Sequence, residues 1–427
     1  MARKMKDSGI EWIGEIPEGW EIKYFVQLFS QVKNKNIGLR EKNLLSLSYG
    51  KIKQKSIETV GGLLPDNFEG YNIIDRNDIV LRLTDLQNDQ HSLRVGLSPE
   101  RGIITSAYCS IRVRGAESPK YLYYYLHTFD IAKGFYGMGS GVRQGLNWDG
   151  LKYIKILLPP QHEQDRISVF LNQKTLEIDS MLSKTISSIE EYKKLKQAVI
   201  TQAVTKGVRG EREMKDSGNP WFGQIPADWK LTRVGLHFSI ILGKMLCNAP
   251  LNDTYTLEPY YCAADVHFDG VADGERKKMW FSPIEKDLYR VSVGDLLVVE
   301  GGAGAGGSAI VENQDSDTYI QNSIMIVRSK GNADNRYLRY LLEFLVKQGY
   351  IDVVCNKATI PHFTKDKLSC VPFCLCPTGE QEEIADYLDA KCAEIDGLIA
   401  KKEQLVKELE SYKKSLIYEV VTGKREV

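Results

Sequence analysis

The sequence predicts an α+β protein with a pseudo-two-fold internal repeat. Two globular segments are joined and followed by two long helices, which we expect to form an antiparallel coiled coil. Three observations lead to this fold class: a short tryptophan-containing segment occurs twice, a seven-residue apolar periodicity runs through two long stretches, and short strand-like runs lie between them. At 427 residues the chain is too long for one ordinary core, which agrees with such a division.

The head segments are the clearest repeat. MKDSGIEWIGEIPEGW begins at residue 5 and MKDSGNPWFGQIPADW begins at residue 214, in register at an offset of 209. Because ten positions recur in register, chance does not explain the match. We assign 1–19 and 208–228 to the two heads.

The globular segments follow the heads, at 20–160 and 229–377. Runs such as DIVLRL from residue 78 and GDLLVV from residue 294 are typical of strands between turns, and Asp78 of the first run aligns with Asp295 of the second at an offset of 217. YLYYYLH from residue 121 and YLRYLLE from residue 337 are typical of helices, and we expect their aromatic side chains to pack in the core. Each segment is therefore mixed.

The long helices are predicted at 161–207 and 378–424, where the flanking sequences align at an offset of 217. Apolar residues recur alternately four and three apart, with Lys196 and Lys413 interrupting both stretches at the same place. About 45 residues make a helix of roughly 65 Å, too long to bury this seam on one globule, so the helices should pair. The residues assigned to pairing are Ile178, Leu182, Ile189, Tyr192, Val199, Ile395, Ile399, Val406, Leu409 and Leu416.

A glycine-rich string, GAGAGG from residue 302, fits the GxGxxG pattern of dinucleotide sites. A dinucleotide loop must open a helix, whereas the strand-like SAIV follows here, so a glycine-rich hairpin or a backbone approach to DNA is favoured. The sequence contains no GxxxxGK[ST] phosphate loop, and its histidines and cysteines form no spaced ligand set. We therefore predict no catalytic residue, no metal site and no cofactor in this chain.

Charge is distributed unevenly although the chain as a whole is neutral. Residues 20–160 carry 19 Lys and Arg against 13 Asp and Glu, while residues 229–377 carry 16 against 17. A basic balance in the first globule is compatible with contacts to phosphates. No apolar run approaches the roughly 20 residues that span a bilayer, and no secretory signal is recognisable, so we expect a cytoplasmic protein without a membrane partner.

Candidate DNA contacts are basic, amide and hydroxyl side chains in loops and on one strand face. Lys51, Lys53 and Lys55 alternate along a strand, a pattern that fits phosphate contacts and a solvated edge strand equally well. The remaining candidates in the first globule are Arg82, Thr84, Gln87, Asn88, Arg94, Arg143, Gln144 and Asn147. Those in the second globule are Arg276, Lys277, Lys278, Lys357, Thr359 and His362.

With its doubled heads, its PxxEQ helix starts at 160–164 and 377–381, and its helix ends AVTKG at 203–207 and VVTGK at 420–424, the chain resembles the DNA specificity subunits of type I restriction-modification systems. The loop GSGVRQGLN at 139–147 also resembles loops of that family. The resemblance covers essentially the whole chain. It implies two target-recognition domains, each reading one half of a split, asymmetric site in double-stranded DNA.

The resemblance also implies partners. Two methyltransferase subunits would dock on the helices and carry S-adenosylmethionine, and restriction subunits would bring ATP- and Mg-dependent translocation and cleavage. Two other classes remain open. The neutral charge and long helices also fit a repeat-built protein scaffold that never reads DNA, and the glycine string leaves a nucleotide-dependent enzyme as a further alternative.

Overall fold

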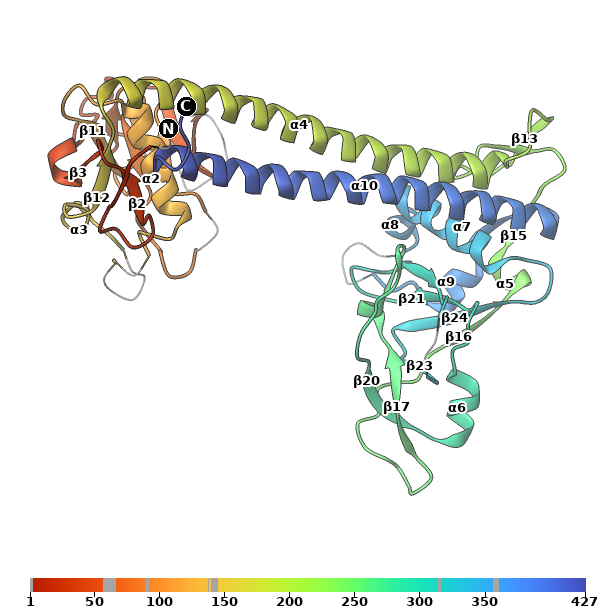
Figure 1. Cartoon of the computed structure of the whole chain (residues 1–427). Coiled ribbons are helices and arrows are strands. Elements are labelled where there is room, and N and C mark those ends of the chain that lie inside the picture. The colour runs from red at the N-terminus through yellow and green to blue at the C-terminus, as the bar shows by residue number, and fades with distance from the viewer. Residues whose placement is uncertain are drawn as a thin grey trace. The chain divides into compact units, whose positions relative to one another are not determined.

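The computed structural model describes residues 3–56, 67–89, 92–136, 138–139, 145–313, 316–355 and 361–427 (Figure 1). It divides into two compact units. The first comprises Met1–Ile186 together with Glu403–Val427, and the second comprises Ser187–Lys402. Both units mix strands and helices, as predicted, and each is described here by itself.

The described residues of the first unit form two four-stranded sheets and two two-stranded antiparallel pairs. One sheet has the order β4-β11-β8-β9 and is antiparallel throughout; the other has the order β6-β5-β10-β7, with β5 and β10 parallel. The head forms the pair β1-β2, and β3 pairs with β12. The strands are β1 (Met5–Asp7), β2 (Glu15–Pro17), β3 (Glu21–Tyr24), β4 (Phe29–Gln31), β5 (Leu44–Ser48), β6 (Lys51–Lys55), β7 (Asn72–Ile74), β8 (Ile79–Leu81), β9 (Val95–Leu97), β10 (Gly102–Ile104), β11 (Cys109–Val113) and β12 (Lys155–Leu158). The short helices are α1 (Phe25–Leu28), α2 (Pro119–Ile131) and α3 (Trp148–Leu151).

Helix α2 forms the centre of this unit. It begins cleanly because Ser118 caps it and Pro119 occupies its first turn, where proline costs no hydrogen bond. Tyr121 is fully buried, and its hydroxyl lies 3.1 Å from the carbonyl of Leu157 and 3.3 Å from that of Val421. The tyrosines therefore pack in the core, as expected from the sequence.

The second unit repeats this order of elements. Its head forms β13-β14, β15 pairs with β25, and one sheet has the order β16-β24-β21-β22 and the other β20-β17-β23. The strands are β13 (Met214–Asp216), β14 (Gln224–Pro226), β15 (Lys230–Arg233), β16 (Phe238–Leu242), β17 (Thr256–Tyr261), β18 (Val266–His267), β19 (Gly270–Val271), β20 (Lys277–Phe281), β21 (Leu296–Val299), β22 (Ser308–Ile310), β23 (Tyr319–Ile320), β24 (Ile324–Ser329) and β25 (Pro372–Leu375). Its short helices are α5 (Val234–His237), α6 (Pro283–Tyr289), α7 (Asn335–Lys347), α8 (Tyr350–Val354) and α9 (Lys365–Ser369).

An ion pair between a buried aspartate and a partly exposed arginine shows how closely the two units correspond. Arg112 Nε lies 2.7 Å from a carboxylate oxygen of Asp78 in the first unit, and Arg328 Nε lies 2.7 Å from one of Asp295 in the second. Both aspartates precede the central strand of a sheet and are almost fully buried. The correspondence of these two strand starts, predicted from the sequence, is thus present in the fold.

The long helices are α4 (Gln161–Lys206) and α10 (Thr378–Val421), within three residues of the predicted ends. Gly207 and Gly423 follow them with φ values of +76° and +73°, a left-handed conformation that glycine adopts without strain. The predicted pairing residues lie on the less exposed side of each helix. Ile178, Ile189, Ile395 and Leu416 are buried, and Leu182, Tyr192, Val199, Ile399, Val406 and Leu409 are half-buried.

Within each unit, a part of α4 shares a hydrophobic core with a part of α10. In the first unit Ile178 and Leu182 belong to the same cluster as Leu409 and Leu416. In the second unit, where Figure 1 shows α7 alongside the start of α10, Arg336 of α7 forms ion pairs of 2.7 and 2.8 Å with α10. Each globule is therefore packed onto helix segments from both long helices.

Candidate nucleic-acid interface

The polar loops of the first unit meet at the end of its antiparallel sheet. The loop from β8 to β9 carries Thr84, Gln87 and Asn88, all exposed, and the partly exposed Arg82. The segment before α3 reaches this loop, since the amide of Leu146 donates to the carbonyl of Leu83 at 2.9 Å. The structure thus brings the two predicted loop regions together.

Candidates in the segment before α3 have different outcomes. Arg143 and Gln144 lie outside the described residues. Asn147 is exposed, but its side-chain oxygen caps α3 by accepting from the amide of Gly150 at 3.1 Å. The amide oxygen of Asn147 is therefore engaged locally, which makes the loop from β8 to β9 the better candidate surface.

Arg94 corrects the sequence prediction. Its side chain is fully buried, so the expectation that it touches DNA directly is wrong for this structure. Its guanidinium donates to the carbonyls of Arg82 and Thr84 at 3.1 and 2.8 Å, inside the loop that holds the exposed candidates. A charged loop residue is normally expected at the surface, and no local sequence pattern marks this one as internal.

Lys51, Lys53 and Lys55 lie on β6, the edge strand of the second sheet of this unit. All three are exposed, while Ile52 between them packs towards the sheet's hydrophobic cluster. Lys51 also forms a 2.8 Å ion pair with Asp179 of α4, which partly neutralises it. Lys53 and Lys55 are therefore the better phosphate candidates, although the structure is equally that of a solvated edge strand.

The turn that leads into β6 touches the loop from β8 to β9, because the amide of Gly50 donates to the carbonyl of Leu93 at 3.1 Å. Tyr49 in this turn is 76% exposed and adopts φ +47°, an uncommon conformation for a bulky residue. An exposed aromatic ring between the lysine strand and the polar loop is a candidate for stacking or sugar contacts that the sequence reasoning missed. In the sequence, Tyr49 is indicated only by its position directly before Gly50 and the alternating lysines of β6.

The charge of the loop is fixed by its own contacts. Hydrogen bonds from Ser92, followed by the charges of Arg82 and Arg94, lower the pKa of Asp89 to about 2. Burial raises the pKa of Asp130, which supports the loop from α2, to about 6. The loop therefore keeps an ionised aspartate paired with Arg82 at 3.3 Å, beside exposed amide and hydroxyl groups.

The second unit has an edge strand of the same kind. Lys277 and Lys278 are exposed on β20, which pairs with β17 at the edge of a three-stranded sheet. Arg276 is engaged within the protein instead: its guanidinium lies 4.7 Å from the ring of Tyr261, and 3.4 Å separates it from a carboxylate oxygen of Asp265. Arg276 is thus a weaker DNA candidate than its two neighbours.

The glycine-rich string of the second unit forms the turn of an antiparallel hairpin between β21 and β22. The prediction of a hairpin is confirmed, and the dinucleotide reading is wrong because no helix starts there. The exposed His362 bridges to Gly301 beside this turn, with Nδ1 3.4 Å from Glu300 Oε2. Lys357 and Thr359 lie outside the described residues.

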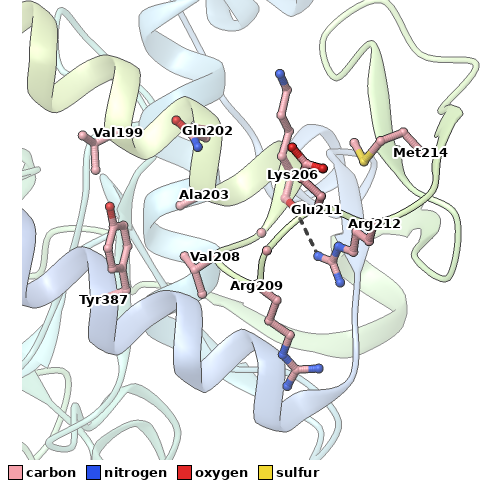
Figure 2. Close-up of a pocket in the computed structure, with 12 residues that line it drawn as sticks. Val199, Gln202, Ala203, Lys206, Val208, Arg209, Glu211, Arg212, Met214 and Tyr387 are labelled. Atoms are coloured by element: carbon pink, nitrogen blue, oxygen red, sulfur yellow. Dashed lines mark hydrogen bonds between the residues drawn. The ribbon is translucent and has the colours of Figure 1, made fainter.

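A further surface lies at the C-terminal end of α4 in the second unit (Figure 2). It is a pocket of about 580 Å³ bounded by α4, the segment 207–214 and Tyr387. The arginines beside it hold the head to α10: Arg209 lies 2.7 Å from Glu383, and Arg212 lies 2.5 Å from the fully buried Glu380. This mixed polar and apolar wall fits a protein contact better than a nucleotide site.

We call the Arg212–Glu380 contact, in which an arginine of the head segment pairs with a glutamate at the start of a long helix, a head clasp. The first unit has an equivalent head clasp. Arg3 lies 2.6 Å from Glu163 at the start of α4, and the indole of Trp20 donates to that carboxylate at 3.0 Å. The guanidinium of Arg3 lies 5.7 Å from the ring of Trp20, as that of Arg212 lies 5.1 Å from the ring of Trp229. Each head therefore ties a glutamate of the PxxEQ helix start to a tryptophan.

The described residues provide neither a metal-binding cluster nor a membrane-spanning helix. Among them, no three or more His, Cys, Asp and Glu side chains gather closely enough to hold a metal ion. The helices in the described part of the chain include none that is long and apolar enough to traverse a bilayer.

Comparisons with known proteins agree on one family. The family model described as "Type I restriction modification DNA specificity domain" matches residues 273–408. A Methanocaldococcus jannaschii protein named as the specificity subunit of the type I restriction enzyme MjaX is 26% identical, with 96% of this chain and 95% of the relative covered. The MjaVIII specificity subunit of the same organism is 22% identical, over 96% and 93%.

Solved structures share the fold. A chain from a structure described as the "structural basis underlying complex assembly and conformational transition of the type I R-M system" matches with a TM-score of 0.70 at 17% identity, covering 96% of this chain and 99% of that one. The HsdS subunit from Thermoanaerobacter tengcongensis matches with a TM-score of 0.54, also at 17% identity, over 96% and 98%.

Proposed function

We propose that the chain is a specificity subunit of a type I restriction-modification system and that it selects the DNA site on which such a complex acts. Each unit binds one half of a bipartite, asymmetric site in double-stranded DNA. The first unit uses the loop from β8 to β9 and the lysines of β6, and the second uses the turn from β21 to β22, His362 and the lysines of β20.

One observation carries this proposal: the two units share the same framework, but the loops at the ends of their sheets differ. The head clasps Arg3–Glu163 and Arg212–Glu380 and the ion pairs of Asp78 and Asp295 recur, whereas the loops at the sheet ends differ in length and composition. A repeated framework is suited to binding two identical partner subunits, and different loops are suited to binding two different DNA half-sites. Linking two DNA-binding domains of modest affinity in one chain also raises their joint affinity, because the second domain binds at a high effective concentration.

The long helices have two roles in this proposal. The half-buried seams of α4 and α10 support one antiparallel coiled coil with pseudo-two-fold symmetry, which sets the spacing between the half-sites. The same helices, with the head regions beside them, dock two methyltransferase subunits. The pocket at Gln202, Lys206 and Tyr387 is the part of this docking surface that offers both polar and apolar groups (Figure 2).

Catalysis belongs to the partners in this proposal. The chain acts in the cytoplasm and supplies no catalytic residue. The methyltransferase subunits bind S-adenosylmethionine, and restriction subunits use ATP and Mg. The glycine-rich string, which fits a nucleotide-loop pattern in the sequence, lies in the turn of a hairpin, and this arrangement favours the division.

Selection from a random pool of DNA duplexes, with the chain bound to its methyltransferase partner, tests the proposal. We expect enrichment of two short sequence elements separated by a fixed unread spacer. The competing function is a repeat-built scaffold that binds only proteins. A complex that assembles but enriches no sequence would establish the scaffold and refute DNA readout.

A further inference from the structure

Arg94 is a buried cation of the first unit that contacts the candidate DNA-reading loop from β8 to β9. Its side chain is 0% exposed. The guanidinium donates to the carbonyls of Arg82 at 3.1 Å, Thr84 at 2.8 Å and Asp85 at 3.3 Å, and also to the carbonyl of Asp89. One side chain thus holds together the backbone of residues 82–89, the described part of the loop that follows β8.

A second layer ties this arginine to helix α2 and the segment after it. The hydroxyl of Tyr136 accepts from Arg94 Nε at 3.1 Å and donates to the carbonyl of Asp89 at 3.3 Å. The backbone amide of Arg94 donates to Asp130 Oδ2 at 2.6 Å, and Asp130 is itself buried. The loop is therefore fixed to the central helix through Arg94.

The energetics favour a single loop conformation. A guanidinium removed from water is costly unless its donors are satisfied, and here the acceptors are loop carbonyls and one hydroxyl. Moving the loop would separate those carbonyls and leave a buried cation unsatisfied. The exposed side chains of Thr84, Gln87 and Asn88 stand on this backbone, so their positions are set by Arg94.

The second unit has no arginine at the equivalent place. Val95 begins β9 as Ser308 begins β22, so Gly307 stands where Arg94 does. The turn there is closed by its own backbone, with the amide of Gly306 donating to Val299 at 3.0 Å and that of Gly307 to Gly304 at 2.8 Å. Bracing by a buried side chain is thus a property of the first unit.

We propose that Arg94 is a positioning residue for base readout by the first unit: it touches no DNA, and it determines sequence preference by fixing the loop that presents Thr84, Gln87 and Asn88 to base edges. The inference rests on the proposed function. Direct readout needs donors and acceptors held in register with the base edges. A looser loop should therefore lose discrimination at particular base pairs more than it loses overall affinity.

The test compares sequence selection from random duplexes by methyltransferase complexes of several full-length variants. Arg94→Lys keeps the charge but cannot reach the same set of carbonyls, and Tyr136→Phe removes only the supporting hydroxyl. Gln87→Ala marks the positions that the loop reads. The matched controls are Arg112→Lys, which weakens the ion pair with Asp78, and Tyr124→Phe, which loses the 3.2 Å contact with Thr175.

We expect Arg94→Lys to lower discrimination roughly tenfold at positions within one half-site, the same half-site that Gln87→Ala affects, and to leave the other half-site intact. Tyr136→Phe should relax the same positions less. Both controls should retain the wild-type motif even where they lower the melting temperature. If Arg94→Lys does not fold, relaxation in Tyr136→Phe without relaxation in Tyr124→Phe still decides the question.

Two results would overturn the inference alone: a wild-type bipartite motif that is unchanged in Arg94→Lys and Tyr136→Phe, or a uniform loss of affinity for all sequences that the controls share. A wild-type complex without any motif would overturn the proposed function, and this inference with it. The two failures are therefore distinguishable in a single experiment.

Discussion

Asp179 of α4 and Lys413 of α10 form an ion pair of 2.5 Å in the first unit, and the second unit repeats it with the helices exchanged, as Lys196 of α4 lies 2.6 Å from Asp396 of α10. Each aspartate directly follows a buried isoleucine of the seam. The two lysines that interrupt the apolar periodicity in the sequence thus have matching acidic partners on the opposite helix.

The pair Asp179–Lys413 should contribute measurable coupling because both side chains are about three-quarters buried. We expect a coupling free energy of about 1 kcal/mol from a double-mutant cycle of Asp179→Asn and Lys413→Met, because solvent partly screens the two charges. Hydrogen exchange of the α10 segment 403–421 measures it. The exposed pair Lys193–Glu190 is the control, and equal coupling in both pairs would contradict this account.

The same pair gives a pH dependence. Burial acts to raise the pKa of Asp179, but the hydrogen bonds and charges of Lys413 and Lys51 outweigh it and lower the pKa overall. A carboxyl with a lowered folded-state pKa stabilises the fold above its unfolded pKa of about 4, and this contribution is lost as the pH falls through the lowered value. The measured coupling should therefore disappear in acid, and coupling that persists below that range would be inconsistent with an ionic contact.

The head clasps should differ in strength. Glu380 is fully buried against Arg212, whereas the side chain of Glu163 is 14% exposed beside Arg3. We expect Glu380→Gln to lower the free energy of local unfolding by about 2 kcal/mol, because the guanidinium of Arg212 loses its carboxylate partner. Glu163→Gln should lower it less. Exchange in the peptide that begins α10 should be roughly 30-fold faster in Glu380→Gln. A larger effect of Glu163→Gln on the start of α4 would reverse the ranking.

Phosphate and base contacts should separate experimentally in the first unit. Lys53→Ala should lower affinity for all sequences and reduce the slope of log affinity against log salt by about 0.9, as expected for one lost phosphate contact. Gln87→Ala should instead change the preferred sequence and leave the slope intact. A salt titration with specific and random duplexes measures both. An unchanged slope in Lys53→Ala would identify β6 as a solvated edge strand.

His127 should remain neutral in the folded protein. Burial, followed by the charges of Lys413 and Lys414, lowers its pKa to about 4. Because the unfolded chain binds the proton near 6.5, stability should fall as the pH drops from about 6.5 towards 4. NMR of labelled histidine gives the titration, and the resonance missing from His127→Gln identifies it. A midpoint near 6.5 would show that the ring is not desolvated.

The sequence predicts the scaffold well because its signals are periodic and duplicated. Asp78 aligns with Asp295 in the sequence, and Gly207 and Gly423 mark the helix ends. The pairing of strands was not predictable. Strands β5 and β10 pair in parallel although some fifty residues separate them, and strand sequences of three to five residues do not specify which strand they pair with.

The candidate site was predicted only in outline. The sequence predicts two candidate loops that the contact between Leu146 and Leu83 brings together, but it gives no sign that a basic side chain there is internal. Arg94 and Arg276 are engaged within the protein because carbonyls of the loop before Arg94 and the ring of Tyr261 receive them. These contacts depend on how each loop folds back on itself, and the residues directly beside the arginines do not reveal that path.

The most direct measurement is methylome sequencing of a host that carries this chain with its proposed methyltransferase partner, compared with a chimaera in which residues 20–160 come from a known type I specificity subunit. The account predicts a bipartite methylated motif that requires this gene, and a chimaera whose motif keeps one half-site and changes the other. A motif altered in both halves, or in neither, would contradict the assignment of one half-site to each unit.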